Sequence, residues 1–288
     1  MIIAIASGKG GTGKTTVAVN LALVFDQPVQ LLDCDVEAPN AHLFLSTISD
    51  FEQEVTRPIP MVDESLCDGC GECSRLCVYH AIVVLKSTPL IFPELCHSCG
   101  GCTLVCPKNA IREVPRRIGV IKKSKWRDLS LVYGRLDISV AMAPPLIRAV
   151  KSHRRTDRTA ILDAPPGTSC PVITTLSGAD LVILVTEPTP FGLHDLQLAV
   201  EMVRTLGLSF GVVVNRMGIG DDRIQEYCQE QNIPIFFEIP DDRRIAELYA
   251  RGVPLVDALP EYRRRFVSFR DDLMFAASRG AGLVTVGL

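Results

Sequence analysis

The sequence predicts an α/β fold in which a mostly parallel sheet is flanked by helices, with a small cysteine-rich domain inserted into the chain. Along residues 1–56 and 115–288, short apolar runs alternate with amphipathic stretches, as in sheets covered by helices on both faces. Between them, over 57–114, cysteine, glycine and proline become frequent and the long helical patterns stop. Because the α/β pattern resumes afterwards, we interpret 57–114 as an insertion and the two flanking segments as one discontinuous domain.

The periodicity places the individual elements. We expect strands at Ile2–Ala6, Val29–Asp33, Leu136–Ala141, Thr159–Asp163, Leu181–Thr186, Gly211–Asn215 and Ile235–Ile239. We expect helices to begin near Lys14, Pro145, Pro171, Phe191, Asp222, Arg243 and Glu261.

Composition narrows the class of protein. The 288 residues are 47% apolar, which is enough for one large core, and a net charge of -3 does not favour a nucleic-acid partner. No apolar run reaches the roughly 18 residues of a membrane helix, so we expect no stable membrane insertion. The N-terminus lacks a basic segment and a cleavage site, and eight of the eleven cysteines fall in two tight clusters. This usage indicates metal ligation in a reducing compartment, the cytoplasm.

A glycine-rich loop follows the first expected strand. Residues 7–16 read Ser-Gly-Lys-Gly-Gly-Thr-Gly-Lys-Thr-Thr, which completes the G-x4-G-K-[ST] pattern, and a helix follows. Backbone N–H groups of such a loop surround phosphate oxygens, aided by the helix N-terminus. Lys14 should reach the β and γ phosphates and Thr15 should ligate Mg²⁺. We therefore predict an ATP or ADP site formed by Gly8, Gly10, Gly11, Thr12, Gly13, Lys14, Thr15 and Thr16.

The additional lysine in this loop, Lys9, makes the motif more specific. The sequence resembles the deviant Walker A motif of the MinD/ParA/Mrp family, which includes the nitrogenase iron protein. In that family the early lysine crosses a dimer interface to the partner's nucleotide. The resemblance implies that Lys9 has this catalytic role and that the chain is an ATP-hydrolysing, ATP-dependent homodimer.

Other segments resemble the same family in the same order. Leu31–Asp35 is similar to its second strand and first switch, which implies that Asp33 holds the magnesium shell and that Asp35 acts on the attacking water. Ala160–Thr168 resembles Walker B and the second switch; Asp163 would act on Mg²⁺ and Gly167 would contact the γ-phosphate. By the same resemblance, Asn215 would pair with adenine and Pro240 would form the other wall of the base pocket.

The cysteines repeat as a unit. Cys-x2-Cys-x2-Cys-x3-Cys occurs twice at an offset of 29 residues, and Ala81-Ile82 recurs as Ala110-Ile111. This is the spacing of bacterial two-cluster ferredoxins, in which the fourth ligand of each cluster comes from the other repeat. The predicted [4Fe–4S] ligands are Cys67, Cys70, Cys73 and Cys106 for one cluster, and Cys96, Cys99, Cys102 and Cys77 for the other. Zinc is the alternative, although zinc sites prefer paired Cys-x2-Cys separated by longer loops.

The remaining features leave the partner open. We expect Cys170 to start a helix and pack in the core, with an interface ligand or redox thiol as the alternative. The basic run from Arg116 to Arg127 is interpreted as a solvated linker, the alternative being a docking site for an acidic redox partner. Three functions follow in order of preference: an ATP-gated electron carrier, an Mrp-like iron–sulfur or metal-cofactor assembly ATPase, and a MinD/ParA-like positioning ATPase. The first two require an unidentified redox or cofactor-assembly partner protein.

Overall fold

The structure, a computed structural model, describes residues 1–45 and 51–279. A nine-stranded sheet has the order β11-β10-β9-β1-β8-β2-β7-β6-β3. Its strands are β1 (Ile2–Ala6), β2 (Val29–Asp33), β3 (Phe51–Val62), β6 (Ile111–Trp126), β7 (Leu129–Leu136), β8 (Thr159–Asp163), β9 (Leu181–Thr186), β10 (Phe210–Met217) and β11 (Ile235–Pro240). All pairs from β11 to β7 are parallel, whereas β6 is antiparallel to both β7 and β3.

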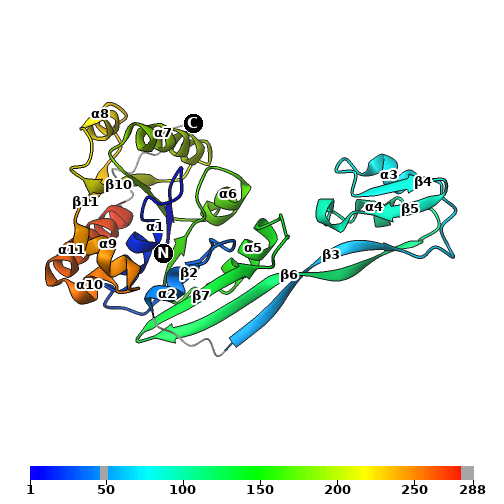
Figure 1. The fold of residues 1–288 in the computed structure, drawn as a ribbon, viewed down its shortest axis with the longest axis horizontal. Helices are drawn as coiled ribbons and strands as arrows, with labels where there is room; N and C mark the ends of the chain where they lie inside the picture. The colour runs from blue at the N-terminus through cyan, green and yellow to red at the C-terminus, as the bar shows by residue number, and fades with distance from the viewer. Residues whose placement is uncertain (46–50, 280–288) are drawn as a thin grey trace.

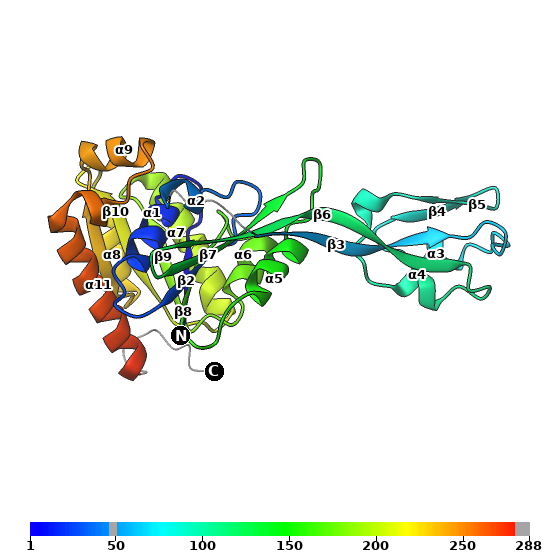
Figure 2. The same cartoon turned by 90° about the horizontal axis from the view of Figure 1, so that it is seen from below.

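Helices cover both faces of the parallel part, because its strands are apolar on both sides. Ala4 and Ala6 of β1 face one cluster of buried side chains, and Ile3 and Ile5 face the other. One face is packed by α5 (Pro144–Ser152), α6 (Cys170–Leu176), α7 (Pro190–Thr205) and α8 (Arg223–Glu230). The other is packed by α1 (Lys14–Ala22), α2 (Ala41–Phe44), α9 (Arg243–Ala250), α10 (Leu255–Ala258) and α11 (Pro260–Arg279). Figures 1 and 2 show these layers.

Strands β3 and β6 leave this core as a long two-stranded ribbon, and residues 63–110 form a small unit at its far end (Figures 1 and 2). We call β3 and β6 the ribbon and residues 63–110 the cysteine unit. The unit contains α3 (Glu72–Leu76), β4 (Ile82–Leu85), β5 (Thr88–Ile91), a 3-10 turn η1 (Pro93–Leu95) and α4 (Gly101–Leu104). The sequence-based boundaries at 56/57 and 114/115 fall inside the two ribbon strands.

Most of the expected strands and helix starts are present within a residue or two, but two interpretations were wrong. The strand expected at Leu136–Ala141 lies upstream as β7, and the chain turns after Leu136, with Ser139 at a φ of 71°. The basic run is no linker: it belongs to β6, where it pairs across the ribbon with acidic residues of β3. Glu52 lies opposite Lys122 and bonds to it over 2.9 Å. A charged strand without apolar alternation carries little period-two signal, so sequence patterning could not identify it.

The last long helix is docked on the core. Tyr262, Phe266, Phe269 and Leu273 of α11 are buried, and Phe266 meets Phe237 of β11 edge-on at 5.0 Å between ring centroids. Among the residues that the structure describes, no helix is both long and apolar enough to cross a bilayer.

Candidate functional site

The glycine-rich loop joins β1 to α1 at the carboxyl edge of the parallel sheet, where ligands bind in open α/β folds. Gly11 and Gly13 have φ angles of 79° and 95°, a backbone conformation that disfavours side chains. Lys14 is buried, and its ammonium donates to the Ser7 hydroxyl over 2.9 Å. Burial lowers the pKa of Lys14, while the charges of Asp163 and Asp35 oppose that shift. The loop thus holds a desolvated cation against acidic groups.

Three aspartates gather beside this lysine. Asp163 ends β8 with no exposed surface, and its Oδ2 accepts a hydrogen bond from the Thr15 hydroxyl over 2.6 Å. Its other oxygen, Oδ1, is buried and has no partner among the described residues. Burial and the nearby Asp33 raise the pKa of Asp163. Burial also raises the pKa of Asp35. Such closely placed buried carboxylates favour the binding of a cation.

Asp33 has a structural position. Its carboxylate accepts hydrogen bonds from the backbone N–H groups of Asp35, Asn40 and Ala41, over 3.1, 3.0 and 3.0 Å. These bonds fold residues 34–40, which we call the switch segment, around the end of β2. Burial nevertheless raises the pKa of Asp33 to about 7.

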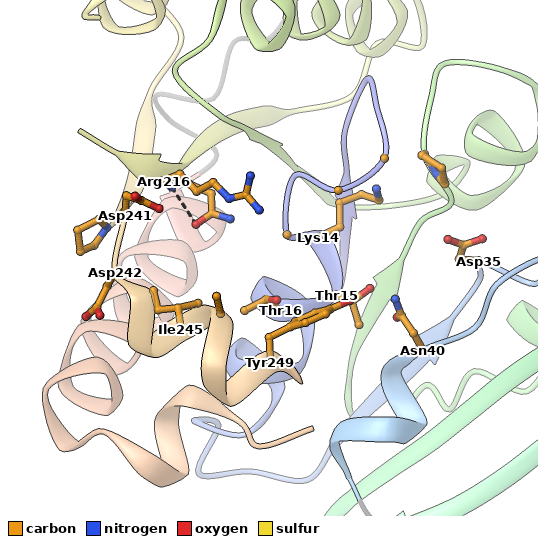
Figure 3. A pocket seen from close by; sticks show the side chains of 17 residues that line it. Lys14, Thr15, Thr16, Asp35, Asn40, Arg216, Asp241, Asp242, Ile245 and Tyr249 are labelled. Atoms are coloured by element: carbon orange, nitrogen blue, oxygen red, sulfur yellow. Dashed lines mark hydrogen bonds between the residues drawn. The ribbon is translucent and has the colours of Figure 1, made fainter. Parts of the chain in front are cut away.

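A cavity of about 390 Å³ opens over the loop (Figure 3). The predicted residues that line it are Gly10, Gly11, Gly13, Lys14, Thr15, Thr16, Asp35, Asn215 and Pro240. Gly8, Lys9, Thr12, Asp33, Asp163 and Gly167 do not line it. Two of these connect the loop to neighbouring segments. The Thr12 carbonyl accepts a hydrogen bond from the Asn215 amide over 2.9 Å, and the Gly167 N–H donates to the Ser7 carbonyl over 3.0 Å.

Sequence reasoning missed several residues of the cavity wall. Ile245, Ala246 and Tyr249 come from α9, and Ile245 and Tyr249 project into the cavity (Figure 3). The i, i+4 spacing of Ile245 and Tyr249 places them on one face of the helix, and it is the sequence signal that could have identified them. Asn40 lines the opposite side, and Arg216 follows Asn215 with a φ of 57°.

Lys9 does not line the cavity and is held within its own chain. Its ammonium bonds to the carboxylate of Glu187, which follows β9 and is 8% exposed. The second oxygen of Glu187 receives Arg216 over 3.3 Å. Glu187 directly follows a buried strand, and ligands bind at the carboxyl ends of parallel strands. This position could therefore have identified Glu187 as a candidate site residue.

Four of the cysteines converge on a second, smaller cavity. Cys67, Cys70, Cys73 and Cys106 line it together, so three thiols of the first motif meet the last thiol of the second. Burial, and then the Cys106 and Cys67 thiols, raise the pKa of Cys73. Within the described residues, no three His, Cys, Asp or Glu side chains are close enough to hold a single metal ion.

The two halves of the cysteine unit repeat in backbone geometry as well as in sequence. Ala81 N–H donates to the Cys77 sulfur and Ala110 N–H to the Cys106 sulfur, both over 3.3 Å. The residues that precede the two alanines also match: His80 and Asn109 have φ angles of 51° and 50°. The Cys77 segment lies against the second motif, since Tyr79 stacks on His97 with ring centroids 3.5 Å apart.

The other three cysteines lie apart. Cys34 and Cys228 are buried, and burial raises the pKa of Cys228 to about 11. Cys170 begins α6 but is exposed, so the expectation that it packs in the core was wrong. It lines a cleft together with Tyr79 and His97 of the cysteine unit.

A buried lysine and aspartate and a half-buried threonine around a glycine-rich loop define a P-loop nucleotide-binding protein. The chain belongs to the CobQ/CobB/MinD/ParA nucleotide-binding domain family, whose profile matches residues 3–255. An uncharacterized protein of Methanocaldococcus jannaschii is 31% identical over 262 residues, or 88% of this chain and 90% of that protein.

The iron-sulfur cluster carrier protein of Synechocystis sp. is 25% identical over 279 residues, which are 90% of this chain and 65% of that protein. In fold, the chain is similar to the septum site-determining protein MinD of Pyrococcus horikoshii, solved with Mg-ADP. The TM-score is 0.58 at 20% identity, covering 94% of this chain and 95% of MinD.

Proposed function

We propose that the protein is an ATP-hydrolysing homodimer whose nucleotide state gates electron transfer through two [4Fe–4S] clusters. One observation carries the proposal: the ribbon that bears the cysteine unit is part of the same sheet as the nucleotide site. Strand β6 pairs with β7, β7 pairs with β2, and β2 ends at Asp33 beside the switch segment.

The nucleotide site fits Mg²⁺ and a nucleoside triphosphate. The orphaned oxygen of Asp163 and the adjacent Thr15 hydroxyl offer hard oxygen ligands, and Lys14 supplies a fixed positive charge. When bound, the metal would neutralise charge developing on the phosphate oxygens. Asn215 and Pro240 line the cavity, and Tyr249 gives it an aromatic wall for the base.

The protein's own groups would perform the rest of the hydrolysis. Asp35 lines the cavity beside Lys14, where its carboxylate would orient the attacking water and accept its proton. The raised pKa of Asp35 suits a proton acceptor. Lys9 would leave Glu187 and reach the partner's nucleotide in the dimer.

The cysteine unit fits two cubane clusters, with Cys67, Cys70, Cys73 and Cys106 at one and Cys96, Cys99, Cys102 and Cys77 at the other. Four thiols from both motifs around one cavity match the ligand set of a cubane, in which the fourth ligand comes from the other repeat. Backbone N–H groups already donate to Cys77, Cys96 and Cys106. When bound, each cluster would supply one-electron redox chemistry.

A short mechanical path connects the two sites. His42, just beyond the switch segment, stacks on Tyr133 of β7 with ring centroids 4.8 Å apart. Val36 accepts a hydrogen bond from Leu136 N–H over 2.8 Å. A change in the switch segment on loss of the γ-phosphate would therefore act directly on the strand that anchors the ribbon.

The test is a redox titration of anaerobically purified protein with Mg-ADP and with a non-hydrolysable ATP analogue and Mg²⁺. We expect a different cluster potential or a different rate of reduction of an external acceptor in the two states. Lys14→Ala, which removes the phosphate contact, should abolish the difference. Identical potentials and rates in both states, with nucleotide shown to be bound, would contradict gating.

Assembly of clusters on other proteins is the second candidate. It is favoured by the similarity to iron-sulfur cluster carrier proteins and by the exposed Cys170. Transfer of a cluster to an apo-ferredoxin, lost in Cys170→Ser but retained in the buried-thiol control Cys228→Ser, would support it. A positioning role is third, because α11 is docked on the core through buried aromatic residues.

A further inference from the structure

The two cysteine motifs share their cysteine spacing and their positive-φ positions, but their electrostatic surroundings differ. Arg57 of β3 reaches into the second motif, where its guanidinium donates to the Cys96 carbonyl and, over 2.6 Å, to the Pro93 carbonyl. Arg57 is 5% exposed. A buried cation therefore lies beside the first cysteine of the second motif.

This cation is not neutralised by the protein. Within residues 1–45 and 51–279, Arg57 forms no ion pair, and its Nε is buried without a hydrogen-bond acceptor. Glu94 is the nearby carboxylate, but it is exposed and bonds to Arg116 over 2.6 Å, and this bond is the main cause that lowers its pKa. An unpaired buried charge is costly unless a counter-charge is present. A thiolate-bound cluster at the adjacent Cys96 would supply the missing anion.

The first motif has no buried cation among the described residues, and carboxylates take two of its matching positions. The position equivalent to His97 is Asp68, and the position equivalent to Phe92 is Asp63. The cations near this motif are exposed. Arg75 donates to the Cys70 carbonyl over 3.0 Å and bonds to Glu72, and Lys108 lies 3.8 Å from Asp68. Charges exposed to water are screened strongly, whereas a buried charge acts through a low dielectric.

We propose that Arg57 holds the reduction potential of the cluster ligated by Cys96, Cys99, Cys102 and Cys77 above that of the other cluster. A cluster gains negative charge on reduction, so a nearby buried cation stabilises the reduced form more than the oxidised form. Two equal motifs thus become an ordered pair, in which an electron on the first cluster passes to the second. The inference rests on the proposed function, because it requires both clusters.

Arg57 also links this cluster to the nucleotide domain. Its guanidinium lies 3.9 Å from the sulfur of Met142, in the segment that leads into α5. The higher-potential cluster is accordingly the one on the side of the nucleotide-binding core. The cleft beside it is lined by Arg57, His97, Met142 and Cys170.

The test is an EPR-monitored dithionite titration of anaerobic holoprotein. Wild type should show two separate one-electron steps. Arg57→Gln should lower the equilibrium constant for reduction in the upper step at least tenfold, which is a fall of 59 mV in its potential for one electron. The potential of the lower step should not change. Arg57→Lys, which keeps the charge, should restore most of the separation. The matched control Arg75→Gln removes an exposed cation beside the first motif and should leave the upper step unchanged.

Different results would overturn this inference and the proposed function. Coincident steps in wild type with full iron content would overturn it, as would an Arg57→Gln protein with full iron content and an unchanged upper step. If Arg57→Gln loses its clusters, the comparison of wild type with Arg57→Lys decides: a smaller separation in the lysine variant than in wild type supports the inference, and loss of all separation despite the retained charge overturns it. A wild-type protein without clusters would instead refute the proposed function.

Discussion

Replacement of Asp33 by asparagine should stabilise the protein at high pH and bring little or no gain at low pH. In the nucleotide-free protein, burial raises the pKa of Asp33 from 3.8 to about 7. Between these values the folded state holds a proton that the unfolded state has lost, so stability falls as pH rises through this range. At 1.36 kcal/mol per pKa unit, ionised Asp33 costs the folded state about 4 kcal/mol above pH 7.

The asparagine variant avoids this cost but weakens the hydrogen bonds of the switch segment. One oxygen of Asp33 accepts hydrogen bonds from the N–H groups of Asn40 and Ala41, and the other accepts one from Asp35. An amide accepts at only one of these two positions, which forfeits about 1 to 3 kcal/mol. At pH 5 the unfolded state is already ionised, which costs wild type about 1.6 of these 4 kcal/mol, so Asp33→Asn should lie within about 1.5 kcal/mol of wild type there. At pH 8, where the full cost applies, the variant should be more stable than wild type by about 1 to 3 kcal/mol.

The assay is urea unfolding of nucleotide-free protein in EDTA, followed by circular dichroism at both pH values. Asp157→Asn is the control: Asp157 is exposed, and Arg158 and Arg155 hold its pKa low, so its titration lies below pH 5 and adds no difference between pH 5 and pH 8. A loss of stability in Asp33→Asn of the same size at both pH values would refute this reasoning.

Three other predictions follow from single contacts. Glu187→Gln releases Lys9 from its intrachain ion pair and should tighten ATP-dependent dimerisation about tenfold, measured by sedimentation equilibrium. An unchanged dissociation constant would show that the ion pair does not hold Lys9 back from the dimer. Tyr249→Ala removes the aromatic wall of the cavity and should weaken ATP binding by about 1 to 2 kcal/mol in calorimetry, whereas equal affinity would place the base elsewhere. Phe266→Ala empties a fully buried position between Phe237 and Phe269 and should cost about 3 to 5 kcal/mol in urea unfolding; a loss below about 1 kcal/mol would show that the site collapses.

The parallel core was predictable because its strands carry continuous apolar runs and its loop motif is tied to a strand and a helix. Ile2–Ala6 and Thr159–Asp163 are examples in which the predicted bounds and the strand coincide. The ribbon was not predictable, because charged residues such as Glu52 and Lys122 are stabilised by each other across the strands and not by burial. Their partners are distant in sequence, so no local window contains the signal.

The candidate site divides in the same way. The loop residues around Lys14 follow one another in sequence, so their spacing is visible in the chain. Tyr249, Glu187 and Arg57 depend on which elements meet in space. Arg57 in particular lies 39 residues from the Cys96 carbonyl that it binds. A single basic residue in a strand has no local pattern that identifies such a contact.

The measurement that tests the central claim most directly is the iron and acid-labile sulfide content of anaerobically purified protein, combined with its EPR spectrum after reduction. The account predicts about eight iron and eight sulfide per chain and the signals of two reduced cubane clusters. Colourless, iron-free protein that carries zinc at the same cysteines would contradict it.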